Sequence, residues 1–398
     1  MKILVISQYY YPEQFQINEI APELVRRGHE VTVVCGLPNY PKGKIFEGYE
    51  NRFEEVIDGV KVFRCKNVPR GNNPIQLIRN YWSFAKESKK VVRTLPGVYD
   101  VVLGYQLSPI TSMLAALEYK KLHGTPVVFY TLDIWPVSAE AMLHGKKNPI
   151  YWWVKKLSKK IYKGADRILV TSRPFIDYLH GVLDIPTERM AYLPQHAGTG
   201  MLDMDLQADD NGIADFMFAG NLGKGQRIDV IIKAAAVIGA RKDYRIHVVG
   251  DGRMRQELEQ MVKENGLEEN VVFYGNQKRE DMPSFYKKAD ALLITLRGNN
   301  EVGNTMPGKL QMYMTTGKPI LGAINGAAAE VIEEAQCGSC VKAGDYEGLA
   351  KLMKFYIEHP MDYNVCGENA RRYFKKHFTL ENYMEGLEAE LRRLVQGV

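Results

Sequence analysis

The stretch of residues 2–35, KILVISQYYYPEQFQINEIAPELVRRGHEVTVVC, decides the fold class of this chain. It begins with an apolar run at residues 3–6, continues through an amphipathic segment that ends at Gly28, and closes with a second apolar run at residues 31–35. Strands that are continuously apolar are typical of parallel sheets covered by helices on both faces. The stretch therefore predicts the first strand–helix–strand unit of a doubly wound α/β domain.

The same alternation extends outward from this stretch along the whole chain. Further strand-like runs follow at residues 99–105, 126–131, 167–172, 215–220, 244–250, 270–275, 289–295 and 318–323. Helical patterns lie between them at residues 75–94, 108–121, 149–163, 228–240 and 254–265. A polar, glycine-rich segment at residues 195–212 interrupts the alternation once, which indicates a linker between two α/β halves.

We therefore predict two Rossmann-like, doubly wound parallel-sheet domains. The first spans residues 1–197, a linker spans 198–214, and the second domain spans 215–375. Residues 376–398 are expected to form a C-terminal helix that returns towards the first domain. In this architecture ligands bind at the carboxyl ends of the strands, in a cleft that both domains face.

Length and composition are those of a soluble, two-domain protein. The chain has 398 residues, of which 45% are hydrophobic and 25% charged. The apolar run at residues 3–6 is too short for a signal peptide, and no other segment is long and apolar enough to span a bilayer. Five scattered cysteines are typical of free thiols in a reducing compartment. We expect a cytoplasmic protein.

Charge is distributed unevenly between the two halves. Residues 1–198 carry 27 Lys and Arg against 18 Asp and Glu, a net charge of +9, whereas the remainder carries 25 against 29, a net charge of −4. The basic first half is expected to meet an anionic surface or ligand. Nothing in the sequence resembles a nucleic-acid-binding pattern, so we expect no nucleic-acid partner.

Three strand-to-helix junctions in the second half are candidates for binding phosphate. Gly220 and Lys224 follow one strand, Gly250 ends the next, and a Gly- and Asn-rich loop leads into Pro307 with Lys309 in the following helical turn. Glycine allows close approach of the backbone, and the start of a helix offers free N–H groups to an anion. All three could converge on one diphosphate. The alternative for the first junction is a tight turn with a solvated lysine.

Several motifs, in this order and at this spacing, resemble one enzyme family. They are YYPEQFQINEIAPELVRRGHEVTVVCG (residues 10–36), LDIWP (132–136), GNLGKGQ (220–226), VVGDG (248–252) and MPGKLQMYMTTGKPIL (306–321). The chain resembles the retaining glycosyltransferases of family 4, which have the two-domain GT-B fold. It is most similar to the bacterial O-antigen and capsule branch that includes L-fucosamine transferases.

The resemblance implies that a UDP-sugar lies along the second domain and that the acceptor binds to the first. Lys224 matches the lysine that contacts the donor diphosphate. Gly220 and Asn221 stand at the Gly-Arg position of the family, so one positive charge is missing unless Arg227 or Lys309 replaces it. The implied donor-binding residues are Gly220, Asn221, Lys224, Gly250, Asn304, Thr305, Pro307, Gly308 and Lys309.

Acidic and histidine positions depart from the family pattern. The two glutamates that relatives place eight residues apart align with Asn304 and Met312, and Glu301 could supply the first carboxylate from a rearranged loop. In the first domain Leu132 stands where many relatives have histidine, while Asp133 remains. The implied catalytic residues are therefore Asp133, Lys224 and Glu301.

Asp133 also has a plain structural interpretation. At the end of a strand, its carboxylate could accept a hydrogen bond from a sugar hydroxyl or act as a base. It could instead cap the helix that follows. Nearby, Gln16 and Asn18 replace the Gly-Gly pair that relatives place against the diphosphate.

No metal or other cofactor is expected, because lysines and backbone dipoles can stabilise a departing diphosphate without one. Asp203 and Asp205 form an Asp-x-Asp pair, but they lie in the linker rather than after a strand.

The segment at residues 148–166 combines two tryptophans with five lysines. A helix of this composition could bind anionic lipid headgroups at the inner face of the cell membrane. A polyprenyl-diphosphate-linked glycan acceptor would agree with such a contact. The interpretation favoured by the spacing of the apolar residues is packing on the core with a basic outer face. The residues predicted to pack inward are Ile150, Trp153, Leu157 and Ile161.

Together these observations predict a retaining glycosyltransferase of bacterial surface polysaccharide biosynthesis. It would transfer a sugar, with N-acetylated amino sugars among the candidates, from a UDP-sugar to a glycan or lipid-linked acceptor. One alternative is a nucleotide-sugar epimerase or hydrolase of the same architecture. The other is a non-catalytic UDP-sugar-binding partner subunit, suggested by the missing acidic pair and histidine.

Overall fold

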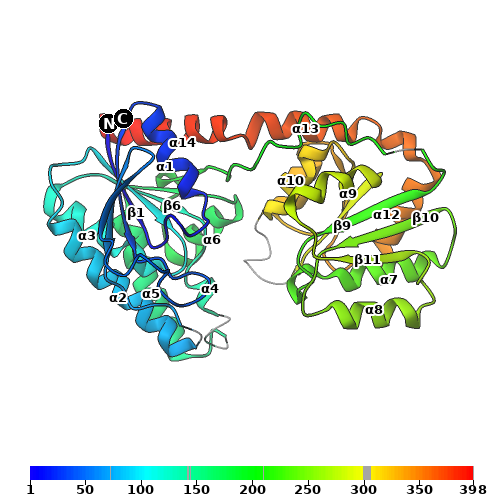
Figure 1. Cartoon of the computed structure of the whole chain (residues 1–398), viewed down its shortest axis with the longest axis horizontal. Coiled ribbons are helices and arrows are strands. Elements are labelled where there is room, and N and C mark those ends of the chain that lie inside the picture. Colours follow the sequence, from blue (N-terminus) through cyan, green and yellow to red (C-terminus); the bar gives the residue numbers. More distant parts are fainter. Residues whose placement is uncertain (72, 141–142, 144, 209, 299–305, 398) are drawn as a thin grey trace. The chain divides into compact units, whose positions relative to one another are not determined.

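The computed structural model describes residues 1–71, 73–140, 143, 145–208, 210–298 and 306–397. The chain forms two compact units, one made of Met1–Pro194 with Met384–Val398 and the other of Gln195–Tyr383. Each unit has its own β-sheet (Figure 1). This division confirms the prediction of two parallel-sheet α/β domains.

The sheet of the first unit has the strand order β3-β4-β2-β1-β5-β6-β7-β8. Its strands are β1 (Lys2–Ser7), β2 (Glu30–Gly36), β3 (Glu54–Ile57), β4 (Val60–Cys65), β5 (Val101–Gln106), β6 (Val127–Thr131), β7 (Arg167–Val170) and β8 (Met190–Tyr192). All pairs are parallel except β3 with β4. Residues 3–6 of β1 are fully buried at the centre of the sheet, as the continuous apolar run predicts.

Helices connect the parallel strands of this unit. They are α1 (Ile17–Arg26), α2 (Pro74–Arg93), α3 (Leu114–His123), α4 (Val137–Glu140), α5 (Pro149–Gly164) and α6 (Pro174–Leu183). None of the described helices of the chain is long and apolar enough to cross a membrane.

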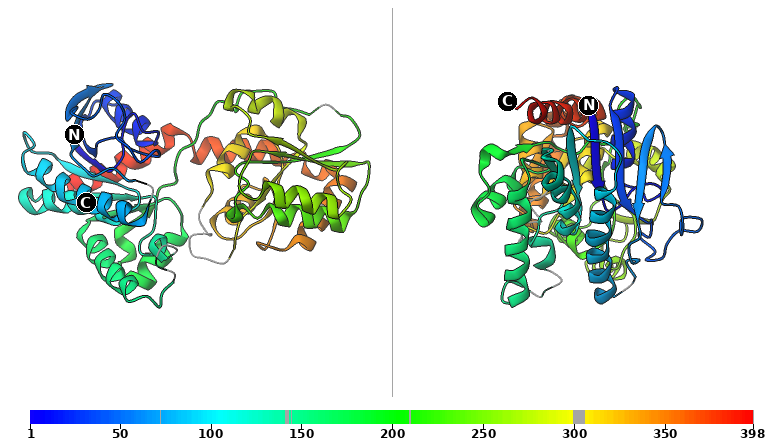
Figure 2. Two further views of the ribbon diagram at one scale, coloured as in Figure 1. Left: turned by 60° about the horizontal axis from the view of Figure 1, so that its bottom comes forward. Right: turned by 90° about the vertical axis from the view of Figure 1, so that its left-hand side faces the viewer.

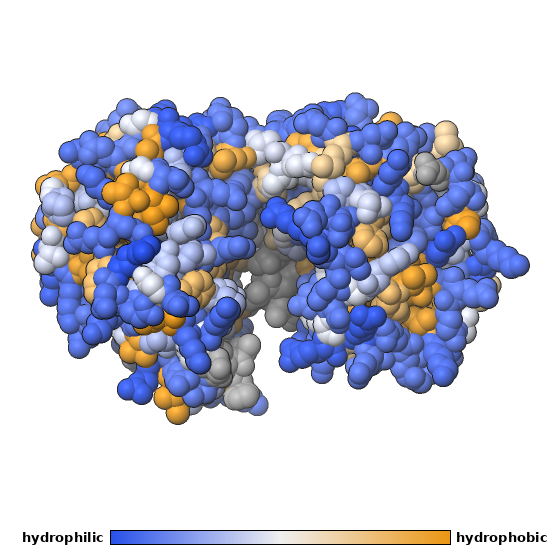
Figure 3. Space-filling model, viewed as in Figure 1, coloured by the Kyte–Doolittle hydropathy of each residue, from blue (hydrophilic) through white to orange (hydrophobic). Residues whose placement is uncertain are grey.

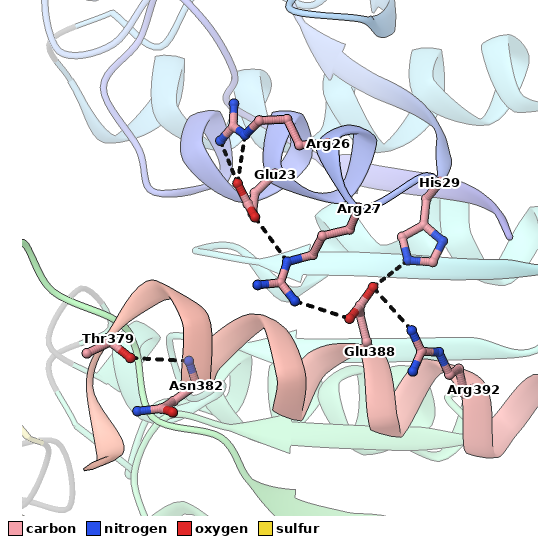
Figure 4. Close-up of polar contacts among 8 residues, drawn as sticks. All are labelled: Glu23, Arg26, Arg27, His29, Thr379, Asn382, Glu388 and Arg392. Carbon is pink, nitrogen blue, oxygen red and sulfur yellow. Dashed lines mark hydrogen bonds and ion pairs between the residues drawn. The ribbon is translucent and has the colours of Figure 1, made fainter. Parts of the chain in front are cut away.

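The last helix, α14 (Leu380–Gln396), adds residues from the end of the chain to the first unit. Its Glu388 carboxylate lies 2.6 Å from His29 Nε2 and 3.4 Å from Arg27 Nη1 (Figure 4). Glu390 pairs with Arg167 at 2.7 Å. Because His29 precedes β2 and Arg167 begins β7, α14 lies at the edge where the parallel strands begin. Asp133 follows β6 and therefore lies at the opposite, carboxyl edge of the sheet.

The second unit has six parallel strands in the order β11-β10-β9-β12-β13-β14. They are β9 (Ala214–Ala219), β10 (Tyr244–Val249), β11 (Val271–Gly275), β12 (Ala291–Thr295), β13 (Ile320–Ala323) and β14 (Gly338–Val341). The helices are α7 (Ile228–Ile238), α8 (Arg255–Glu264), α9 (Met282–Lys288), α10 (Gly308–Thr316), α11 (Ala327–Glu334), α12 (Tyr346–Glu358) and α13 (Cys366–His377).

Strand β9 shows why this sheet is covered on both faces. Phe216 and Phe218 belong to a buried cluster with residues of α7, α8 and α12, whereas Met217 and Ala219 belong to a second cluster with residues of α10, α11 and α13. Successive side chains of a strand point to opposite faces of the sheet. The two clusters are therefore the two halves of a doubly wound core.

The predicted core packing of α5 is wrong for two of its four residues. The exposed fraction is 55% for Ile150 and 54% for Trp153, whereas Ile161 is buried and Leu157 is half-buried. The inward face is shifted by one residue, because a second stripe at helical spacing competes with the predicted one. The buried residues of that stripe are Tyr151, Val154, Ser158, Ile161 and Tyr162.

Candidate functional site

The loops after β9 and β10 meet at the carboxyl edge of the second sheet. Gly220 N donates to Val249 O at 2.9 Å, and Gly250 N donates to Gly275 O at 2.8 Å. A Cβ atom added to Gly250 would lie 1.9 Å from Gly220 O, and both glycines have positive φ, +129° and +149°. Only glycine fits two backbones that approach this closely. The structure thus brings together two of the three predicted junctions.

Lys309 brings the third junction to the same place. It lies in the first turn of α10, and a Cβ atom at Gly220 would be 2.8 Å from Lys309 Nζ. The ammonium donates to Gln226 Oε1 at 2.8 Å and lies 3.6 Å from the centroid of the Phe218 ring. Burial lowers the pKa of Lys309 to about 7.

This position is electrostatically unfavourable without an anion. Among the described residues no carboxylate pairs with Lys309. Helix α10 also begins without a side-chain cap, at Pro307, so the positive end of its dipole adds to the lysine charge. A buried cation at a helix N-terminus is the arrangement that an anionic ligand stabilises.

Arg227 and Lys309 are the two candidates to replace the positive charge that the family has at position 221, and they lie in different surroundings. Arg227 Nε and Nη2 donate to the Asp229 carboxylate at 2.8 and 3.0 Å, so its charge is already paired. Lys309 lies beside Gly220 instead. Asn221, which stands at the family's arginine position, is exposed, with its amide oxygen next to Gly252. Lys309 is therefore the cation nearest the paired glycines in the described part of the chain.

Lys224 is exposed in the short turn Lys224–Gln226 and lines a separate polar pocket of about 550 Å³. The pocket also contains Arg227, Lys233 and Arg297, and Asp229 and Glu257 contribute carboxylates. Lys224 begins the turn that Gln226 ends, whereas Lys309 donates a hydrogen bond to the Gln226 side chain. The structure thus places the two predicted lysines in different surroundings.

The end of α10 is fixed by contacts within the second unit. Tyr313 is buried, and its hydroxyl lies 2.8 Å from Ala219 N at the end of β9. Gly317 ends the helix with a φ of +72°. Arg371 donates to the carbonyls of Thr315 and Thr316 beside it. The Tyr313 contact thus holds α10 against the end of β9, and the Arg371 contacts fix the last turn of the helix.

The positions at which the family has glutamates lie partly outside the residues that the structure describes. Glu301, Asn304 and Thr305 lie outside the described residues. Met312, at the second glutamate position, is half-buried and lines an apolar pocket of about 490 Å³ with Met201, Met204, Met282 and Tyr286. A thioether at this place cannot accept the strong hydrogen bonds that a carboxylate would accept.

In the first unit, Asp133 lies just after β6 at the carboxyl edge of the sheet. Its carboxylate accepts hydrogen bonds from the hydroxyls of Ser108 and Ser138, and Ser138 lies in α4. Gln106 Nε2 donates to the Asp133 carbonyl at 2.8 Å, and Trp135 Nε1 donates to Ser108 Oγ at 2.9 Å. Asp133 is thus held firmly in place, and its carboxylate anchors the start of α4.

A buried carboxylate that the sequence analysis did not single out lies at the same edge. Glu13 is 2% exposed, and its Oε1 accepts from the backbone N–H groups of Asn39 and Tyr40 at 2.8 and 2.6 Å. Burial raises the pKa of Glu13 to about 7, against these two hydrogen bonds, which lower it. Tyr40 also forms an aromatic cluster with Tyr9 and Phe15. The available signal was the Pro-Glu pair at residues 12–13, in the loop between β1 and α1.

No group of three or more His, Cys, Asp or Glu side chains among the described residues could hold a metal ion. Asp203 and Asp205 are exposed, and Asp205 Oδ1 accepts from Gln207 N at 3.1 Å in a local turn.

Comparison with protein families agrees with the two units. A family described as Glycosyl transferase 4-like domain matches residues 14–196, and one described as Glycosyl transferases group 1 matches residues 207–373.

Similar proteins cover nearly the whole chain. WcaI of Escherichia coli K12, a glycosyl transferase assigned to colanic acid biosynthesis, is 24% identical over 97% of this chain and 100% of its own length. O-antigen chain mannosyltransferase C of Escherichia coli is 20% identical over 97% of this chain and 96% of its own. N-acetyl-alpha-D-glucosaminyl L-malate synthase of Bacillus anthracis is 26% identical over 42% of each chain.

Solved structures show the same fold. Sucrose-phosphate synthase of Thermosynechococcus elongatus superposes with a TM-score of 0.75 at 15% identity over all of both chains. Anabaena Alr3699/HepE in complex with UDP superposes with a TM-score of 0.70 at 15% identity, over 98% of this chain and 100% of that one. The chain belongs to the glycosyltransferases of GT-B fold, with a 4-like domain followed by a group 1 domain.

Proposed function

We propose that this glycosyltransferase is a retaining enzyme that takes its sugar from a UDP-sugar bound to the second unit. The observation that carries the proposal is the buried ammonium of Lys309 beside Gly220 and Gly250, at the uncapped start of α10. A nucleotide diphosphate supplies the negative charge that this arrangement lacks. The Anabaena protein solved with UDP, at 15% identity, supports the same class of donor.

The chemical role of this cluster follows from where charge develops. When the glycosidic bond to the diphosphate breaks, negative charge accumulates on the leaving phosphate. Lys309, the N–H groups at the start of α10 and the backbone at Gly220 are fixed donors that stabilise this charge without reorganising. The proposal therefore requires no metal ion, and Lys224 adds a second cation from the neighbouring turn.

For the first unit we propose a role in binding the acceptor. The Asp133 carboxylate is positioned by Ser108 and Ser138, and it can accept a hydrogen bond from an acceptor hydroxyl. The similar proteins assigned to colanic acid and O-antigen synthesis support a glycan or lipid-linked acceptor of a surface polysaccharide. The N-acetylglucosaminyl relative supports N-acetylated amino sugars among the donors.

A donor screen tests the proposal. Purified protein is titrated with UDP- and GDP-sugars while thermal stability is recorded, and donors that stabilise it are then incubated with acceptor glycans. We expect stabilisation by a UDP-sugar and a product whose anomeric configuration, measured by NMR, equals that of the donor. Inversion would refute the retaining mechanism. Binding of a donor without any turnover would favour the non-catalytic subunit.

A matched pair of variants assigns the binding to the site. Lys309→Met removes the buried charge at nearly constant volume, and Lys233→Met removes an exposed charge from α7. Because Lys233 lines the same pocket as Lys224, a third variant, Lys242→Met, removes an exposed charge outside that pocket and serves as the control. We expect Lys309→Met to weaken UDP binding by roughly 1–3 kcal/mol, as loss of a charge-assisted hydrogen bond does, and Lys242→Met to leave it nearly unchanged. Equal effects of Lys309→Met and Lys242→Met would refute the placement of the diphosphate.

A further inference from the structure

The N-terminal ends of α2 and α5 carry large apolar side chains that the fold leaves in solvent. We call these six residues the apolar end surface: Ile75, Ile78, Trp82, Ile150, Trp152 and Trp153. Their exposed fractions lie between 43% for Trp82 and 71% for Ile75. Single exposed hydrophobic residues are ordinary. Here six lie at the starts of two helices, and four of them, Ile78, Trp82, Ile150 and Trp153, line one hollow, which is typical of an interaction site.

The two helix ends lie together and enclose a groove. The rings of Trp82 and Trp153 are 6.1 Å apart between centroids, so α2 and α5 touch through the patch. Between them lies an apolar hollow of about 170 Å³, whose floor includes Ile110, Trp135 and Leu157. Figure 2 shows both helices beginning at the same end of the unit, and Figure 3 shows hydrophobic areas there within a mostly hydrophilic surface.

Positive charge surrounds this patch without matching negative charge. Helix α5 contains five lysines and no acidic residue, and α2 contains five basic residues and one acidic residue, Glu87. Three of the basic residues, Lys90, Arg93 and Lys159, have carboxylate partners. In the described part of the chain Lys86, Lys156 and Lys160 have none within ion-pair distance. The charges flanking the apolar end surface are thus available to an external anion.

The order of residues along each helix separates apolar and basic zones. On α2, Lys86 follows Ile75 by about 16 Å along the axis, and on α5, Lys160 follows Ile150 by about 15 Å. Trp82 and Trp153 lie between the isoleucines and most of the basic residues. Neither helix has an acidic residue in its first turn, so no carboxylate there offsets the positive end of either helix dipole.

We propose that the apolar end surface docks on an anionic lipid bilayer. The isoleucines enter the acyl-chain boundary, the tryptophans occupy the headgroup interface that indole rings prefer, and the lysines pair with lipid phosphates. The complementarity of charge selects this occupant: ten basic residues on two helices against one acidic residue match an anionic surface. The inference deepens the proposed lipid-linked acceptor, because it names the surface that would bring the enzyme to that acceptor.

The tryptophans provide a direct test. The chain has four tryptophans, and three of them, Trp82, Trp152 and Trp153, belong to the apolar end surface, while Trp135 lines the groove beside it. The full-length protein is mixed with phosphatidylcholine vesicles containing about a third phosphatidylglycerol, with brominated acyl chains as quencher. We expect a blue shift of the emission and quenching by the brominated lipid, and much weaker changes with pure phosphatidylcholine. Unchanged emission with anionic vesicles would overturn the proposal.

Two matched pairs of variants identify the surface. Ile150→Ser/Trp152→Ser is compared with Met361→Ser/Val365→Ser, which removes apolar side chains that are 72% and 61% exposed in the second unit. Lys156→Gln/Lys160→Gln is compared with Lys242→Gln/Lys263→Gln, exposed lysines of the second unit. In vesicle co-sedimentation each first variant is expected to bind roughly tenfold or more weakly, and each control as the natural chain. Equal binding by a pair would place docking elsewhere.

Two further measurements separate this proposal from its competitors. The free protein is sedimented over a range of concentrations, and we expect no self-association through the apolar end surface. Self-association that the Ile150→Ser/Trp152→Ser variant abolishes would instead assign this surface to contact with a second copy of the chain. Turnover with a water-soluble acceptor is expected to survive in that variant. If donor binding fails while vesicle binding persists, the proposed function is wrong and the docking surface stands. The reverse result rejects the docking surface alone.

Discussion

The buried ammonium of Lys309 predicts that donor binding takes up a proton. In the free protein the pKa of Lys309 is about 7, because burial disfavours the charged form. A diphosphate placed beside the ammonium favours the charged form and returns the pKa towards its ordinary value of 10.5 or above. Below pH 6 the lysine is charged in both states, so the effect vanishes there.

The magnitude follows from the fraction of Lys309 that is neutral before binding. With a pKa of about 7, binding takes up about 0.5 proton at pH 7 and about 0.9 proton at pH 8. By linkage, the affinity for the donor falls about 50-fold between pH 7 and pH 9.

Calorimetric titration with a UDP-sugar measures this directly, because its diphosphate does not titrate in that range. Titrations in two buffers with different enthalpies of ionisation give the number of protons taken up. Lys309→Met should abolish the uptake. Lys224→Met removes an exposed cation, so it should lower affinity and retain the uptake. Equal heats in the two buffers for the natural chain, or the same uptake in Lys309→Met, would refute the placement of Lys309 against the diphosphate.

Other perturbations follow from the structure. Gly220→Ala places a Cβ atom 2.8 Å from Lys309 Nζ at a φ of +149°, so it should reduce donor affinity at least tenfold, whereas Gly225→Ala, with open space around it, should not; donor titrations compare the two. Glu388→Ala leaves the buried His29 without its carboxylate and Arg27 with Glu23 but not Glu388, and it should cost about 3 kcal/mol of unfolding free energy. Exposed Glu385→Ala is the neutral control in denaturant titrations. Burial by itself raises the pKa of Glu388, but the His29 hydrogen bond and the charges of Arg392 and Arg27 outweigh burial, so the pKa in the folded protein is lowered. The stabilisation by the Glu388 carboxylate is therefore present above the pKa of the unfolded chain, and it is lost as the pH falls through the lowered pKa of the folded protein. For Glu13, burial raises the pKa from 4.5 to about 7, so stability should fall as pH rises between these values, by no more than about 3 kcal/mol, and Glu13→Gln should remove that slope in thermal denaturation scans.

Strands with continuous apolar runs were predictable because both of their faces are buried. Strands β1 and β12 show this, since every residue from 3 to 6 and from 291 to 295 is buried. The hairpin of β3 and β4 escaped the same reasoning, because β3 is an edge strand with alternating exposure. Its turn, Asp58-Gly59, has positive φ at both residues and was the available signal.

The candidate site was predictable in its glycines but not in its electrostatics. Strand ends followed by glycine indicate close backbone approach, and Gly220 and Gly250 show it. The burial of Lys309 depends on Phe218 and Gln226, which are far from it in sequence, so no local pattern contains it. On α5 the error had a similar cause: two stripes with helical spacing were possible, and tertiary contacts chose between them.

The contribution of α14 to the first unit has a consequence for synthesis. Residues 384–398 are synthesised after the whole second unit, yet they complete a unit whose other residues, up to Pro194, are made before it. Until residues 384–398 are made, the carboxylates of Glu388 and Glu390 cannot pair with Arg27, His29 and Arg167. The first unit therefore reaches its final stability only after the whole second unit has been translated. A chain cut after Tyr383 would contain every residue of the second unit and yet destabilise the first, because the first unit would lose Glu388 and Glu390.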